Sequence, residues 1–307
     1  MDTALVNFNK PRMIFLDKES DETVVIPMSN SAKEVIHILL KLESGADERK
    51  AFKKKLRISL KNKTSANILI STQDLPAAKL SVEVQINITL REGATLNYYL
   101  IHGKSKNIQE SFSHHASLDR ESTFQAVSLA QSGISSMLEY EVDLNGELAQ
   151  ADIKGASILF GNSKSIQKVS VRHKAAHAKS RQFFKNILSG SAQSEFHSLV
   201  HVFADAEKSD SNQLNKNLLL SDSARAFTKP QLQIDNDDVS ATHGATVGQL
   251  DANEIFYLKS RGLSEDSAKH LLIYGFAEEI IEGIEDEELK EEFEAMIRDG
   301  IEKVIQP

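Results

Sequence analysis

The feature that most constrains the fold is a series of short segments in which apolar and polar residues alternate. Val82–Leu90 (VEVQINITL) alternates valine, isoleucine or leucine with polar residues, which is the period of a half-buried β-strand. Similar runs occur in five further segments: Leu56–Leu60, Asn67–Ser71, Leu96–Ile101, Leu138–Leu144 and Ile166–Val171. Polar and glycine-containing clusters separate them, as turns would. We therefore expect strands through the first three quarters of the chain.

A weak internal repeat runs through the same region, in which a turn ends on a small residue and a strand follows. Its occurrences are Thr64-Ser65-Ala66, Glu92-Gly93-Ala94, Arg120-Glu121-Ser122, Asn145-Gly146-Glu147, Gly190-Ser191-Ala192 and Asp222-Ser223-Ala224. The gaps are 28, 28, 25, 45 and 32 residues, and we interpret the 45 as two repeats. Such periods favour a solenoid of about nine rungs, roughly 40 Å long at about 4.8 Å per rung. A β-sandwich, with turns every 8–12 residues or so, is the alternative.

The segment Ala32–Leu56 is ambiguous, because its lysine- and glutamate-rich part Glu43–Lys55 could be helical, but we favour strand, loop, then strand. After Gly248 the pattern becomes helical, so we divide the chain into residues 1–248, a β core, and 249–307, a C-terminal helical domain. Asp251 and Glu254 have the spacing of a capping box, and Gly262 suits the end of that short helix.

A second helix is predicted to begin near Ser264, with one apolar face. Its members are Ala268, Leu271, Leu272, Gly275, Phe276, Ile280 and Ile284. From Glu278 to Glu302 the chain holds 12 acidic residues against Lys290 and Arg298. We interpret this run as a solvated helical face.

Composition excludes several classes of function. There is no cysteine, which excludes disulfides, thiolate metal sites and cysteine nucleophiles in this chain. The net charge of −8 argues against a general nucleic-acid binder. Residues Met1 to Leu16 lack the pattern of a signal peptide, and no apolar run is long enough for a transmembrane helix. We expect a cytoplasmic protein.

Most candidate chemical sites have a simpler structural explanation. His173 and His177 lie four residues apart, as zinc ligands on a helix would, but they follow a strand and lack a third ligand. His114-His115 is a weaker candidate. Gly161–Ser165 lacks the frame of a phosphate-binding loop. The segment from Gly244 to Gly248 lies just before a helix, where backbone amides could meet an anion.

Two further features could be functional or structural. Asp235, Asp237 and Asp238 could form a paired-carboxylate site, as in polysaccharide-cleaving β-helix enzymes, although acidic loops are usually only solvated. His243 lies between the predicted strand Gln231–Ile234 and the C-terminal helices, where a histidine usually caps or packs.

Five blocks of the sequence strongly resemble the SufB/SufD family of iron–sulfur cluster assembly proteins, in order and in spacing. They are Ser180–Gly190, Ala204–Ser221, Thr228–Ile234, Asp237–Asp251 and Ile255–Leu263. The resemblance implies a mainly β fold, a right-handed parallel β-helix with a small C-terminal α-helical domain. It also implies a non-catalytic scaffold with no cofactor of its own, which pairs with a SufB-like subunit and shares a transient cluster with it. A SufC-like ABC-type ATPase would dock on the scaffold, and the isolated chain could form a homodimer.

The string HGATVGQLD and the lack of cysteine resemble the SufD type rather than SufB. His243 then corresponds to a histidine proposed to face a SufB cysteine, which makes it a candidate cluster or iron ligand, since histidine can replace cysteine on iron. In the family the C-terminal helices form the ATPase-docking surface. Phe256, Tyr257 and Arg261 are therefore candidate contacts, with packing as the alternative for Phe256 and Leu258.

The sequence departs from the SufD pattern in two places. Ala241 stands where many SufD proteins have a cysteine. Strand-like sequence also begins early, so the N-terminal helical domain common in SufD proteins is expected to be missing or reduced.

Overall fold

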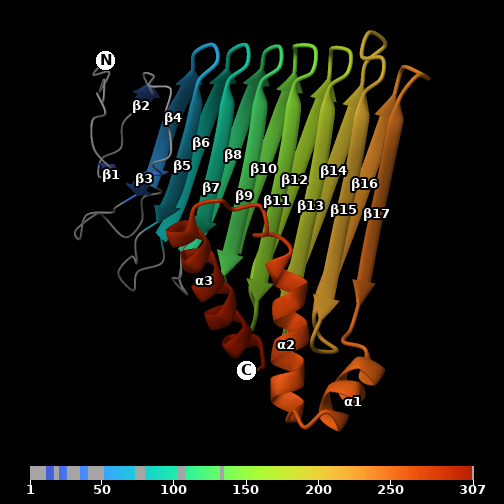
Figure 1. Ribbon diagram of the computed structural model, residues 1–307. Coiled ribbons are helices and arrows are strands. Elements are labelled where there is room, and N and C mark those ends of the chain that lie inside the picture. Colours follow the sequence, from blue (N-terminus) through green and yellow to red (C-terminus); the bar gives the residue numbers. More distant parts are fainter. Residues whose placement is uncertain are drawn as a thin grey trace.

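The computed structural model describes residues 12–16, 21–25, 35–40, 52–72, 80–102, 108–131 and 135–305, of which 12–16, 21–25, 80 and 108 are described as backbone only. In this part of the chain the strands form two parallel sheets, one of nine strands and one of eight (Figure 1). The chain passes from one sheet to the other after each strand, so every strand pairs with the strand two places later. This arrangement is a parallel β-solenoid, which confirms the predicted fold class and rules out the β-sandwich.

The nine-stranded sheet contains the odd-numbered strands. They are β1 (Arg12–Leu16), β3 (Val35–Leu40), β5 (Ser65–Thr72), β7 (Thr95–His102), β9 (Thr123–Gln131), β11 (Gln150–Leu159), β13 (Lys179–Leu188), β15 (Asp210–Leu219) and β17 (Ser240–Gly248). The eight-stranded sheet contains β2 (Asp21–Val25), β4 (Phe52–Leu60), β6 (Leu80–Leu90), β8 (Ile108–Leu118), β10 (Ser135–Leu144), β12 (Lys164–His173), β14 (Gln193–Val202) and β16 (Arg225–Ile234).

Alternation in the sequence becomes alternation between the inside and the outside of the coil. In β12, for example, Ser165, Gln167, Val169, Val171 and His173 are buried, while the residues between them are exposed or half-buried. All six predicted strands lie within observed ones. The strands predicted at the two ends of Ala32–Leu56 correspond to β3 and β4, whereas residues 41–51 lie outside the described part of the chain.

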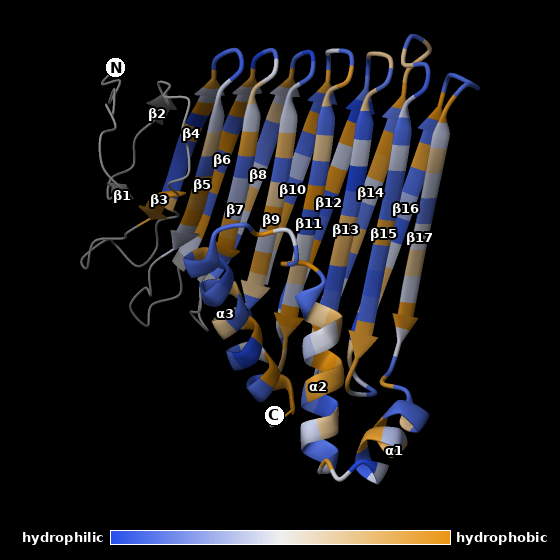
Figure 2. Cartoon of the chain, viewed as in Figure 1, coloured by the Kyte–Doolittle hydropathy of each residue, from blue (hydrophilic) through white to orange (hydrophobic). Residues whose placement is uncertain are grey.

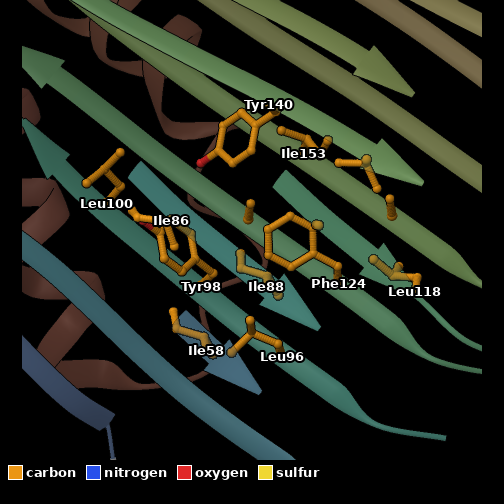
Figure 3. Packing of buried hydrophobic residues seen from close by; sticks show 14 of the residues in the cluster. Ile58, Ile86, Ile88, Leu96, Tyr98, Leu100, Leu118, Phe124, Tyr140 and Ile153 are labelled. Carbon is orange, nitrogen blue, oxygen red and sulfur yellow. The ribbon is translucent and has the colours of Figure 1, made fainter. Parts of the chain in front are cut away.

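The core of the solenoid is built from apolar side chains of both sheets. Figure 3 shows Tyr98, Phe124 and Tyr140 among the aliphatic side chains of the interior. Tyr98 and Tyr140 are fully buried, and the centroids of their rings lie 6.1 and 6.3 Å from that of Phe124. Burial of this apolar surface is the main force that holds the rungs together.

The turns that lead into the nine-stranded sheet explain the repeat. The turns before β5 to β15 each contain a residue with left-handed backbone, such as Gly93 at φ 65° or Glu121 at φ 56°. The amide N–H of that residue donates to a carbonyl in the next turn, for example from Gly93 to Arg120 O at 2.9 Å. The small residue that follows, such as Ala94 or Ser122, is buried beneath the turn.

One part of the repeat was assigned wrongly. The next turn of this kind is centred on His177, whereas Gly190-Ser191-Ala192 and Asp222-Ser223-Ala224 lie in turns at the opposite end of the strands. The gap of 45 residues therefore contains one turn that leads into the nine-stranded sheet. The match that follows the gap lies in a turn at the opposite end of the strands. Both kinds of turn carry a small residue before a strand, so the sequence did not distinguish them.

The C-terminal helices are α1 (Ala252–Ser260), α2 (Glu265–Glu278) and α3 (Glu287–Ile305). Asp251 caps α1 as predicted, but its side chain accepts from Asn253 N rather than from Glu254 N, at 2.8 Å. Ser264 caps α2, and Gly262 between the two helices has a φ of 95°. The last strand ends at Gly248 and the first helix begins at Ala252.

The predicted apolar face of α2 is only partly correct. Leu271 is 52% exposed, whereas Ile273 and Ala277 are fully buried. The helix turns this other face toward α3 and the sheet, and it ends at Glu278, so Ile280 and Ile284 are buried in the connection to α3.

Helices α2 and α3 lie across the nine-stranded sheet and share a core with its outer face (Figures 1 and 2). Seven residues of α3 are buried against it, among them Phe293 and Ile297. The acidic residues of α3 lie on the rest of its surface. Within the described chain, no helix is both long and apolar enough to cross a membrane.

Candidate functional site

The C-terminal end of the solenoid exposes apolar side chains and strand edges. Among the described strands, β16 and β17 are the last in the orders of their sheets, and each pairs on one side only. Three large apolar side chains on them are exposed: Phe227 at 58%, Ile234 at 43% and Val247 at 48%. An edge with unpaired backbone groups and apolar side chains is prone to sheet extension by another chain. We call β16 and β17 the terminal rung.

His243 lies on the terminal rung, in β17, and its side chain is exposed. Its in-register neighbour is Gln213 on β15, a residue of the solenoid interior that is only 1% exposed. In parallel strands, in-register side chains lie on the same face of the sheet. His243 is therefore on the inward-facing side of the last strand, at the end where no further rung covers it.

Ala241 is two residues before His243 and lies on the same face, in register with the buried Ser211. A thiol at this position would stand next to His243 at the open end. With alanine there, the strand offers His243 alone as a metal-binding side chain on that face.

Helix α1 presents the second exposed surface. All of its residues are described and none is buried. Phe256 is 73% exposed and Tyr257 56%, so neither packs onto the second helix, while Leu258 is half-buried. The Arg261 guanidinium lies 5.3 Å from the centre of the Tyr257 ring. An open apolar groove of about 520 Å³ continues this surface from Leu263 along α2 and α3.

Sequence reasoning missed the contact that fixes α2 on the sheet. Lys185 on β13 is 2% exposed, and its ammonium donates to Phe276 O at 2.5 Å and to the Glu279 carboxylate. It also lies 4.5 Å from the centre of the Phe276 ring. Burial lowers the pKa of Lys185, while the hydrogen bond from Lys185 lowers the pKa of the more exposed Glu279. Lys185 and Glu279 are 94 residues apart, so no local sequence pattern predicts their contact.

The two histidine candidates for metal are structural. His173 is buried with Nε2 2.8 Å from Ser180 Oγ, and His177 occupies a left-handed turn at φ 58°. His114 is buried beside Tyr98, whereas His115 is exposed. No group of three His, Asp or Glu side chains in the described chain is arranged to hold a metal ion.

The remaining sequence candidates lie in turns or strands. Asp235 Oδ2 is 2.7 Å from His201 Nε2, and Asp237 and Asp238 complete the turn between β16 and β17. Gly161 forms a turn before β12, with φ 63°. Gly244 and Gly248 belong to β17 rather than to a loop before a helix, so their amides belong to an edge strand.

Most of the chain matches the model of a known protein family. The model of the SufBD core domain of the SUF system for iron–sulfur cluster assembly matches residues 42–276, which include the terminal rung, α1 and most of α2. The chain belongs to the SufBD family.

Similar curated proteins carry SufD or SufBD family names. The iron–sulfur cluster assembly protein SufD of Escherichia coli is 39% identical over 50% of this chain and 36% of its own length. A SufBD family protein of Synechocystis is 41% identical over 45% of this chain and 30% of its own length. SufD of Bacillus subtilis is 35% identical over 36% and 25%. The resemblance to SufD is thus confirmed, and the match spans about a third of the length of the first two relatives.

Proposed function

We propose that this chain is a non-catalytic scaffold subunit for iron–sulfur cluster assembly. The observation that carries the proposal is the coincidence of a SufBD family match with an uncovered terminal rung, which ends the solenoid in exposed strand edges. In this proposal the terminal rung pairs with a SufB-like subunit, and a transient cluster forms at their junction. The cluster is cargo, and the chain holds no cofactor of its own. In this proposal the scaffold acts in the cytoplasm.

Two surfaces have separate roles in this proposal. The terminal rung binds the SufB-like subunit through Phe227, Val247 and strand edges, and places His243 toward the partner. Helix α1 and the adjoining groove bind a SufC-like ABC-type ATPase through Phe256, Tyr257 and Arg261. The exposed aromatic side chains support this role, because aromatic residues and arginine dominate interface hot spots.

Co-purification under anaerobic conditions tests the assignment of surfaces. The tagged chain is co-expressed with a SufB-like subunit and a SufC-like ATPase. We expect Val247→Lys to lose the SufB-like subunit and keep the ATPase, and Phe256→Ala with Tyr257→Ala to do the reverse, so each variant controls for the other. Recovery of neither partner by the unmodified chain contradicts the proposal. The mass of the isolated chain in solution then distinguishes a monomer from a homodimer through the same edge.

The role of His243 is tested in the assembled complex. His243→Ala should lower the yield of cluster while the subunits still co-purify, since the imidazole is exposed and supports no packing. His197→Ala on β14 is the matched control, because that histidine is also exposed, on the outer face of the solenoid. Equal cluster yields in the two variants would show that His243 is not a ligand.

A further inference from the structure

The interior of the solenoid changes from apolar to polar before the terminal rung. One in-register column runs Ile68, Tyr98, Ala126, Ile153, Gln182, Gln213 and His243. The first four of these residues are apolar or aromatic and fully buried. Gln182 and Gln213 are equally buried, at 0% and 1% exposure, although they carry amides.

Strand β15, directly beneath the terminal rung, has a polar inner face from its preceding turn to Asn217. These inward residues are Ser209, Ser211, Gln213, Asn215 and Asn217, each no more than 4% exposed, and the strand ends on the inward, apolar Leu219. Buried polar groups are costly unless they are hydrogen-bonded. The asparagines meet this requirement within the protein: Asn217 donates to Thr246 O at 3.0 Å and Asn215 to Phe184 O at 3.3 Å.

The glutamines do not complete their hydrogen bonds. Ser198 Oγ contacts Oε1 of both Gln182 and Gln213, yet its hydroxyl has one proton to donate. Gln213 Nε2 donates to Gln231 O at 3.0 Å, which fixes the orientation of this amide. Gln213 Oε1 therefore accepts the hydrogen bond from Ser198 Oγ. Gln182 must then turn its amide nitrogen to Ser198, which leaves its oxygen unpaired. In the opposite orientation its nitrogen is unpaired. Either way one buried atom of Gln182 has no protein partner in the described chain.

Ser209 and Ser211 add two more such atoms, since neither hydroxyl has a hydrogen-bond partner among the described residues. Several unpaired polar atoms in one buried region provide what an ordered internal water needs, because such waters typically make about three hydrogen bonds to otherwise unsatisfied groups.

We propose that the last rungs enclose ordered water beneath His243, and that Gln213 is a positioning residue that holds the imidazole ring from below. The second part rests on the proposed role of His243. Gln213 is the in-register neighbour on the same face, and its amide retains one donor and one acceptor site after its bonds to Ser198 and Gln231. A hydrogen bond to one ring nitrogen fixes the tautomer and leaves the other nitrogen for metal, as partners behind histidine ligands commonly do.

The water is tested first, on the unmodified full chain, by a high-resolution crystal structure. We expect ordered water within about 3.2 Å of the Gln182 amide and of Ser211 Oγ. An interior without water at either group would overturn this part of the proposal.

The positioning role is tested by ¹⁵N NMR of the imidazole of the isolated full chain, with His243 assigned through His243→Gln. We expect a single tautomer in the unmodified chain and a mixture in Gln213→Leu. Gln182→Leu is the matched control: it removes the same amide one rung further from His243, and should leave the tautomer unchanged. If Gln213→Leu does not fold, Gln213→Met replaces it.

An unchanged His243 tautomer in a folded Gln213 variant, or a mixture in the unmodified chain, would refute the positioning role. Neither the crystal structure nor the NMR measurement requires a bound cluster. A negative result here is therefore distinct from unchanged cluster yield in His243→Ala, which would refute the ligand role alone.

Discussion

His114 shows how the interior of this solenoid treats an ionisable side chain. It is fully buried, its Nε2 lies 2.8 Å from Tyr98 Oη, and its ring stacks on Tyr140 at 4.2 Å between centroids. Burial lowers the pKa of His114 to about 3 and that of the similarly buried His173 to about 4. Both are therefore neutral in the folded protein at physiological pH, and they serve packing rather than metal binding.

These two histidines should make the protein sensitive to mild acid. Their pKa in the unfolded chain is about 6.5, so the unfolded state takes up protons first and the folded state loses stability as pH falls below that value. Between pH 7.5 and pH 5 each should cost about 2 kcal/mol of unfolding free energy. In His114→Leu the decrease should be smaller by about that amount, as measured by urea unfolding at both pH values. The exposed His197→Ala is the control, and parallel decreases in all three proteins would contradict the assignment.

At the scale of elements, strands were predictable because alternation is local. Val82–Leu90 reveals a strand without any knowledge of its neighbours, and it lies within β6. Alternation also shows which residues share a face within one strand. That Gln213 and His243 lie on the same face of the sheet follows only from the register of β15 with β17. That register depends on contacts between residues 30 positions apart, which a single sequence does not report.

Helix faces were harder to predict than strands. On α2 both Leu271 and Ile273 are apolar, and only the packing of α3 and β13 decides which of them is buried. The residues of the candidate site also divide into those that the sequence suggested and those that depend on tertiary contacts. His243, Phe256 and Tyr257 were found through family resemblance, whereas the Lys185–Glu279 contact exists only in three dimensions.

Two helix glycines should respond in opposite ways to the same substitution. A Cβ on Gly275 in α2 would meet nothing within 4 Å, so Gly275→Ala should stabilise the protein by up to about 1 kcal/mol through helix propensity. A Cβ on Gly300 in α3 would lie 2.9 Å from Ile158 Cδ1 on β11. Overpacking of this kind costs about 1–3 kcal/mol, which should cancel or exceed the gain in Gly300→Ala.

Urea unfolding of the two glycine variants measures the difference directly, with the unmodified chain as reference. Equal stabilisation in both would mean that α3 does not approach β11 as closely as Ile158 and Gly300 indicate.

At the scale of the whole molecule, stability should vary along the solenoid. Each rung contacts only its neighbours, so local stability reflects the local core. The middle rungs bury aromatic and aliphatic side chains such as Tyr98, Phe124 and Tyr140, whereas the last rungs bury Gln213 and Asn215. The terminal rung also lacks a neighbour on one side. An end that is less stable alone can be completed by a partner that adds the next strands.

Native-state hydrogen exchange tests this gradient. In the isolated chain the backbone amides of β16 and β17 should exchange faster than those of β10 to β12, because opening the end breaks one rung interface and opening the middle breaks two. Addition of a SufB-like subunit should slow exchange in β16 and β17 and leave β10 to β12 unchanged, since new strand pairing covers only the edge. Addition of the ATPase should instead protect α1. Uniform exchange along the solenoid, or protection of the N-terminal rungs by the SufB-like subunit, would show that the uncovered end is not where assembly begins.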